Sequence, residues 1–100
     1  MPPVTRRGDS CTGHDCWPSR KSTTGSYSVY VNGIPVHREG DSWEVHCCTH
    51  PDCPHGCHGG VLASGSSTVY ADGHQIGRIG DPVSCGSSVA EGSANVYAGG

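Results

Sequence analysis

One stretch of the sequence matches another without a gap at an offset of 40 residues, and this internal repeat constrains the fold more than any other feature. Residues 25–41 and 65–81 both begin with Gly-Ser, carry Val-Tyr at the same position and end in Arg-x-Gly-Asp. A third unit is divided between the chain ends, with its Gly-Ser-x-x-Val-Tyr opening at 92–97 and its closing Gly-Asp within 7–9. This nested set predicts three related structural units within one domain.

Each complete unit contains a signal for a β-hairpin. Asn32-Gly33 and Asp72-Gly73 lie between apolar residues that alternate with polar ones. Both dipeptides favour a type I′ turn, because that turn needs a positive φ at its two central positions. No stretch keeps apolar residues at the spacing of a helix face. We therefore expect an all-β protein of short antiparallel strands and hairpins with pseudo-threefold symmetry.

The two-residue loop also fixes the strand register. Residue 31 should pair with residue 34, and residue 29 with residue 36, and the second unit should repeat this pairing. The apolar residues of the first hairpin then share one face: Val29, Val31, Ile34 and Val36.

The apolar content is too small to stabilise such a fold alone. Leu, Ile, Val and Phe account for 14 of the 100 residues, below the roughly 20% at which chains begin to look disordered. Ordering the backbone costs about 1–2 kcal/mol per residue. The chain also holds seven His and seven Cys, and domains with small cores are commonly stabilised by a metal or by disulfides.

Charge and hydropathy exclude several classes of protein. The net charge is −3 and the six Lys and Arg residues are scattered, so there is no basic patch for nucleic acid. No apolar run approaches the roughly 20 residues of a membrane span. The N-terminal residues form no apolar core of a signal peptide, so we expect synthesis and first folding in the cytoplasm. Disulfides are rare there, and an odd number of cysteines favours metal binding.

The repeats place four metal-ligating residues in equivalent positions. His58 and Cys85 both lie seven residues before a Gly-Ser, while His14 and His46 both lie five residues after a Gly-Asp. Pseudo-symmetry should bring all four towards one end of the axis. Three imidazoles and one thiolate form a closed tetrahedral set typical of structural zinc. We therefore predict one structural Zn²⁺ ion, worth on the order of 10 kcal/mol of folding free energy by comparison with zinc fingers.

A second group of cysteines and histidines leaves alternatives open. These residues bind a second metal, form disulfides after export, or belong to a decorated loop. His50 and His55 are also alternatives to His46 and His58 as the middle ligands of the first site. His37 and His74, near the hairpin turns, are expected to be solvated or packing residues. The second group consists of Cys11, Cys16, Cys47, Cys48, His50, Cys53, His55 and Cys57.

The Gly-Ser-x-x-Val openings, the Asn-Gly and Asp-Gly turns, the Arg-x-Gly-Asp closures and the His/His/His/Cys set together resemble the PAAR-repeat family. Degenerate forms of Pro-Ala-Ala-Arg stand at residues 35–38 and 75–78, and the resemblance covers essentially the whole chain. It implies a sharp cone with a zinc ion held near its vertex by His14, His46, His58 and Cys85.

The resemblance also implies a function that is not enzymatic. Such a cone caps the trimeric VgrG spike protein of type VI secretion systems, or the central spike of contractile phage tails, with one tip per trimer. It aids piercing by touching the target membrane mechanically, and effector cargo is a candidate second partner. The protein would leave the cell at the spike tip or form part of a phage virion. Residues 1–100 are expected to form a single domain with no appended effector domain.

Two other functions are compatible with the residue content. A zinc enzyme would need an open coordination position and a general base, but the sequence has no His-Glu-x-x-His motif and the predicted ligand set is closed. A small Cys/His-rich metal-binding or redox protein would hold three or more metal ions per chain. Elemental analysis of the metal content separates this last alternative from the spike tip.

Overall fold

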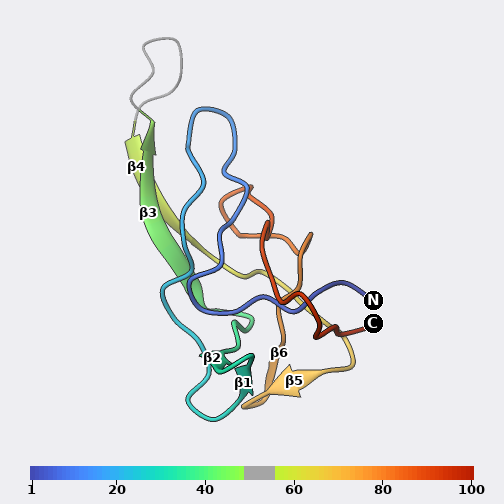
Figure 1. Ribbon diagram of the computed structural model, residues 1–100. Helices are drawn as coiled ribbons and strands as arrows, with labels where there is room; N and C mark the ends of the chain where they lie inside the picture. Colours follow the sequence, from blue (N-terminus) through green and yellow to red (C-terminus); the bar gives the residue numbers. More distant parts are fainter. Residues whose placement is uncertain (49–55) are drawn as a thin grey trace.

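The computed structural model describes residues 1–48 and 56–100, and within these ranges it contains strands and turns but no helix. The strands pair antiparallel as three separate hairpins, β1–β2, β3–β4 and β5–β6 (Figure 1). No helix long and apolar enough to span a membrane is found in this part of the chain. The predicted all-β class is confirmed. The strands are β1 (Tyr30–Val31), β2 (Ile34–Pro35), β3 (Ser42–Cys48), β4 (Gly56–Val61), β5 (Tyr70–Ala71) and β6 (His74–Gln75).

The β1–β2 and β5–β6 hairpins form as their turn residues predict. Asn32 and Asp72 adopt φ values of 56° and 53°, and the glycine after each has a φ of 76° or 80°. Val31 pairs with Ile34, as expected for a two-residue loop. The next apolar pair follows in register, since the Val36 N–H donates to the Val29 carbonyl at 3.0 Å.

The two ends of the chain lie side by side and pair with each other (Figure 1). Pro3 and Tyr97 form an antiparallel bridge, and the Ala98 N–H donates to the Pro2 carbonyl at 3.1 Å. Their register equals that of the other two hairpins. The three corresponding pairs are Tyr30 with Pro35, Tyr70 with Gln75, and Tyr97 with Pro3.

An arginine and an aspartate close a tight turn at the end of each unit. The Asp N–H donates to the carbonyl of the Arg three residues earlier, at 2.9 to 3.0 Å. The intervening glycines have φ near 90°, as position i+2 of a type II turn requires. Each guanidinium donates to its aspartate, and this hydrogen bond raises the pKa of each arginine. The pairs are Arg6–Asp9, Arg38–Asp41 and Arg78–Asp81.

Side chains near the hairpin turns join the three units in a closed ring. The opening serine of each unit donates a hydrogen bond to one residue of the next unit. The closing arginine of the same unit donates to that same residue. In the third unit, which the two chain ends form together, this acceptor is a backbone carbonyl, because a glycine stands at the equivalent position. The links run from Ser26 and Arg38 to Asp72, from Ser66 and Arg78 to Gly99, and from Ser93 and Arg6 to Asn32.

The hydrophobic core is divided into two small clusters. One gathers apolar residues from all three units: Val4, Val31, Val36, Ala71, Ile76 and Ala98. The other lies between the β3–β4 hairpin and the C-terminal part of the chain: Cys11, Trp43, Leu62, Val83 and Val89.

His37 is fully buried between polar partners and an aromatic ring. Its Nδ1 lies 2.6 Å from the Ser22 hydroxyl, and its Nε2 donates to the Asp41 carbonyl at 3.1 Å. The ring centroid is 4.0 Å from that of Trp43. Of the two roles that the sequence allows for His37, the structure shows packing, whereas His74 is exposed.

His37 should make the protein lose stability as the pH falls from about 6.5 towards 4. Burial lowers the pKa of His37 to about 4, whereas an exposed histidine titrates near ~6.5. Between these pH values the unfolded chain binds a proton at His37 and the folded protein does not. Up to about 3 kcal/mol of the unfolding free energy that is present above pH ~6.5 is therefore lost. Urea titrations at several pH values should show a smaller pH slope for His37→Gln than for the unaltered protein. The exposed His74→Gln variant should keep the original slope, and equal slopes in all three would contradict the prediction.

Candidate metal centre

Four predicted ligands from four separate segments converge at one point. Their nearest ring nitrogens and the thiol sulfur all lie within 4.8 Å of one another. These are the four residues that the repeat register singles out: His14, His46, His58 and Cys85.

The β3–β4 hairpin positions two of the histidines. His46 and His58 stand opposite each other in the strand register, and their Nε2 atoms are 2.8 Å apart. The register shifts between Trp43 and His46, as at a β-bulge, which re-aims the following side chains. Gly60 on β4 leaves room for the thiolate, because a Cβ there would meet the Cys85 Sγ at 2.9 Å.

The other two ligands are held by tight turns. His14 and Trp17 exchange backbone hydrogen bonds of 2.8 and 3.0 Å, which close a turn around Asp15 and Cys16. The His14 Nε2 lies 2.9 Å from the His58 Nε2. Cys85 lies in a second turn, and its Sγ is 3.9 Å from the His46 Nε2.

A hydrogen bond orients His46, and the surroundings lower the pKa of His58. The His46 Nδ1 donates to the Pro18 carbonyl at 2.8 Å, and its Nε2 faces the other ligands. A backbone carbonyl in this position typically fixes the tautomer of a metal-ligating histidine. Burial, and then the neighbouring His46 and His14, lower the pKa of His58. Its ring is therefore neutral and able to act as a ligand at neutral pH.

The four ligand atoms lie close enough together to surround one cation, with small adjustments towards a tetrahedron. Nitrogens about 2.05 Å from such an ion lie roughly 3.3 Å apart, and a nitrogen and a sulfur lie roughly 3.6 Å apart. The observed separations are 2.8 and 2.9 Å between nitrogens and 3.9 Å from nitrogen to sulfur. Hydrogen bonding alone explains the cluster poorly, because the His58 Nε2 has two nitrogen neighbours and at most one hydrogen.

Trp17 covers one side of the cluster, and sequence reasoning missed it. Its ring lies 5.0 Å from that of His14 and 4.8 Å from that of His58, between centroids. Its Nε1 donates to the Gly56 carbonyl at 3.0 Å. The only sequence signal is its position three residues after His14. The indole shields the ligands from water and should report on the state of the site by its fluorescence.

Four cysteines of the second group form two disulfides, Cys16–Cys48 and Cys47–Cys57. Cys11 is buried as a free thiol that accepts the Arg20 N–H at 3.4 Å. Within residues 1–48 and 56–100, no second convergent group of metal ligands is found beside the four-residue cluster. The remaining predicted residues lie outside the described part of the chain: His50, Cys53 and His55.

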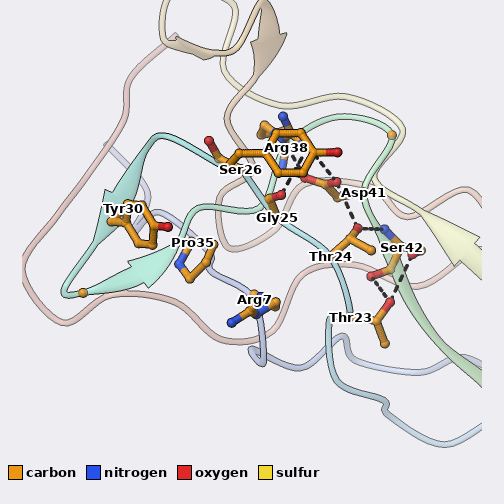
Figure 2. Close-up of a pocket in the computed structure, with 13 residues that line it drawn as sticks. Arg7, Thr23, Thr24, Gly25, Ser26, Tyr30, Pro35, Arg38, Asp41 and Ser42 are labelled. Atoms are coloured by element: carbon orange, nitrogen blue, oxygen red, sulfur yellow. Dashed lines mark hydrogen bonds and ion pairs between the residues drawn. The ribbon is translucent and has the colours of Figure 1, made fainter.

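A polar groove of about 710 Å³ lies on the first unit, apart from the cluster (Figure 2). Arg38 crosses it but is already bound to Asp41 and Asp72. Neither histidine nor cysteine lines the groove. Its one carboxylate, Asp41, is already engaged by the Arg38 guanidinium.

The three linked units and the four-ligand cluster define the class of this protein, an all-β repeat domain with a candidate metal site. The chain is a member of the PAAR motif family, which matches residues 12–91. The resemblance noted from the sequence is thereby confirmed.

Two curated relatives are toxins of Pseudomonas aeruginosa with different named activities. They are the NAD(P)(+) glycohydrolase toxin Tse6 of strain PAO1 and the (p)ppApp synthetase toxin Tas1 of strain UCBPP-PA14. Each is 35% identical over an alignment of 80 residues that covers 76% of this chain but only 18% of the relative. The chain therefore spans less than a fifth of the length of these toxins.

Proposed function

We propose that this protein is the tip of a contractile injection machine, capping the trimeric VgrG-type spike of a type VI secretion system or the central spike of a phage tail. The observation that carries the proposal is the closed ring of links between three equivalent hairpin units. One chain with internal threefold symmetry presents three similar edges, which suit the three identical subunits of a cyclic trimer.

The metal centre gives this tip its rigidity. We propose that His14, His46, His58 and Cys85 hold one structural Zn²⁺ ion, which ties together segments from distant parts of the sequence. When bound, the ion supplies cross-linking rather than reaction chemistry, since four protein ligands leave no position for a substrate water. The shape and the site therefore favour a structural role over an enzymatic one.

The two toxin relatives support a role in delivery. They share the matched region although their named activities differ. A region common to two different activities is best explained as the part that serves transport, and cargo attached to such a tip would be carried out of the cell with it. The activities in the names of the relatives are not proposed for this chain.

Three exposed tyrosines mark the surface that we propose meets the spike. They occupy equivalent positions in the three repeat units and expose 57%, 54% and 50% of their surface. Aromatic side chains are enriched at protein interfaces and at their energetic centres. One such side chain per unit gives each spike subunit the same contact. The residues are Tyr30, Tyr70 and Tyr97.

Mixing the purified protein with a trimeric VgrG-type spike tests the proposed function. Native mass spectrometry should find one tip for three spike chains. A ratio of one tip per spike chain, or the absence of a complex at micromolar concentrations, would exclude the capping model.

Replacing Tyr30, Tyr70 and Tyr97 together by alanine should weaken spike binding by about 100-fold or more. Truncating an interface anchor costs roughly 1 kcal/mol or more at each position. Titration calorimetry or surface plasmon resonance measures the change. Tyr27→Ala is the matched control, because Tyr27 is 88% exposed but has no tyrosine counterpart in the other units. Equal losses in the control and the triple variant would place the interface elsewhere.

A further inference from the structure

We propose that the two disulfides form a redox-dependent lock on the three histidines of the metal centre, an inference that rests on the metal site proposed above. In the oxidised protein the lock holds these ligands in place and retains the ion. In the reduced protein the same ligands are free to separate.

The disulfide cysteines lie beside the histidines in the sequence. Each of the four lies within two residues of one of them. Cys16 stands two residues after His14, Cys47 and Cys48 stand one and two residues after His46, and Cys57 stands one residue before His58. Together the two disulfides thus connect all three histidine-bearing segments, and only Cys85 reaches the site from outside this framework.

The two disulfides leave β3 from opposite faces of the strand. Successive residues of a strand point to opposite faces, so the adjacent Cys47 and Cys48 bond in different directions. Cys48 is buried and joins β3 to the turn that carries His14. Cys47 joins β3 to β4 in direct register with Cys57.

The turn that carries His14 depends most on its link. Cys16 lies inside the turn closed by the backbone hydrogen bonds between His14 and Trp17. The Cys16–Cys48 bond spans a sequence separation of 32 residues, against 10 for Cys47–Cys57. A longer closed loop removes more freedom from the chain. Without this bond, the turn is tied to the β3–β4 hairpin by noncovalent contacts, such as the hydrogen bond from the Trp17 Nε1 to the Gly56 carbonyl.

Pre-organised ligands bind an ion at a smaller entropic cost and release it less readily. In the oxidised protein, His14 cannot move away without moving β3, which carries His46. The ion should therefore leave at least about tenfold more slowly when the disulfides are formed, since each factor of ten needs only about 1.4 kcal/mol.

Thiol–disulfide exchange with a small-molecule disulfide such as glutathione disulfide closes each link. One cysteine thiolate attacks a sulfur of the small-molecule disulfide and displaces one thiol. The second cysteine thiolate then attacks the mixed disulfide and displaces the other thiol. Per link, the protein loses two protons and two electrons and the small-molecule disulfide is reduced to two thiols. A reducing cytoplasm keeps the links open, and oxidising surroundings outside it close them.

Metal release from the zinc-loaded protein tests the lock. The protein is oxidised with glutathione disulfide or reduced with a phosphine, and a coloured chelator then reports the rate at which zinc leaves. We expect release at least about tenfold slower after oxidation. A Cys16→Ser, Cys48→Ser double variant should release zinc at the fast rate in both conditions, while Cys11→Ser should behave like the unaltered protein.

Equal release rates for the oxidised and reduced unaltered protein would overturn the lock, and this comparison decides the question even if the double variant does not fold. Peptide mapping of the oxidised protein should find Cys16 bonded to Cys48 and Cys47 bonded to Cys57. A bond from any of these four to Cys53 would overturn the arrangement. Failure to hold zinc in either state would overturn the lock together with the metal site, a result distinct from equal release rates.

Discussion

Substitution of His46 by alanine is expected to abolish metal binding and to remove the cooperative thermal transition of the reduced protein. His46 exposes only 2% of its surface and contacts two of the other three ligands. Structural zinc contributes on the order of 10 kcal/mol in zinc fingers, about as much as the whole stability of a typical domain. Elemental analysis should fall from one zinc per chain to none, and circular dichroism should follow the lost transition.

His74→Ala is the matched control for this variant. It removes the same side chain from an exposed position on β6. It should keep one zinc per chain and unfold within a few degrees of the unaltered protein. A folded His46→Ala protein with a full equivalent of zinc would show that the cluster is not the metal site. Three or more zinc ions per unaltered chain would favour the metal-storage alternative.

Substitution of Arg78 by alanine is expected to cost about 3–5 kcal/mol of unfolding free energy. Arg78 is 9% exposed and donates both to Asp81 and to the Gly99 carbonyl. Its loss leaves the largely buried Asp81 carboxyl without its charged partner, which is strongly destabilising, although the backbone N–H of residue 78 still donates to it. It also removes one of the two links to Gly99 that join the second and third units, the other being that from Ser66. Urea denaturation monitored by tryptophan fluorescence measures the change.

Two further variants separate the geometry of Arg78 from its charge. Arg78→Lys keeps the charge but lacks the planar guanidinium that serves both acceptors. The unfolding free energy that this variant loses should lie between zero and the loss in Arg78→Ala. Arg7→Ala removes an exposed arginine and should change stability by less than about 0.5 kcal/mol. A loss below about 1 kcal/mol in Arg78→Ala would contradict the structural role of the ring.

The repeat pattern was sufficient to predict the hairpins, because their geometry is local. A type I′ turn at Asn32 or Asp72 fixes the register of the flanking residues without help from distant contacts. The same symmetry argument brought four ligand residues from separate segments to one place. Both predictions used only spacing, which the sequence carries in full.

The β3–β4 hairpin was not predicted, for reasons that are also physical. Residues 56–60 are rich in glycine, which has a low strand propensity. Their pairing with β3 is supported by the contact of His46 with His58 and by the Cys47–Cys57 disulfide. Disulfide connectivity cannot be deduced from cysteine spacing alone. The position of Trp17 over the ligands likewise depends on tertiary contacts.

The third junction of the ring differs from the other two in a way that affects its tolerance to mutation. Asp72 and Asn32 accept their bonds through side chains, so replacing either residue breaks a junction. At Gly99 the acceptor belongs to the main chain, and a substitution at that residue leaves the carbonyl in place. A single substitution of the accepting residue can therefore weaken two of the three junctions. The junction at Gly99, beside the chain ends, keeps its acceptor whichever residue stands there.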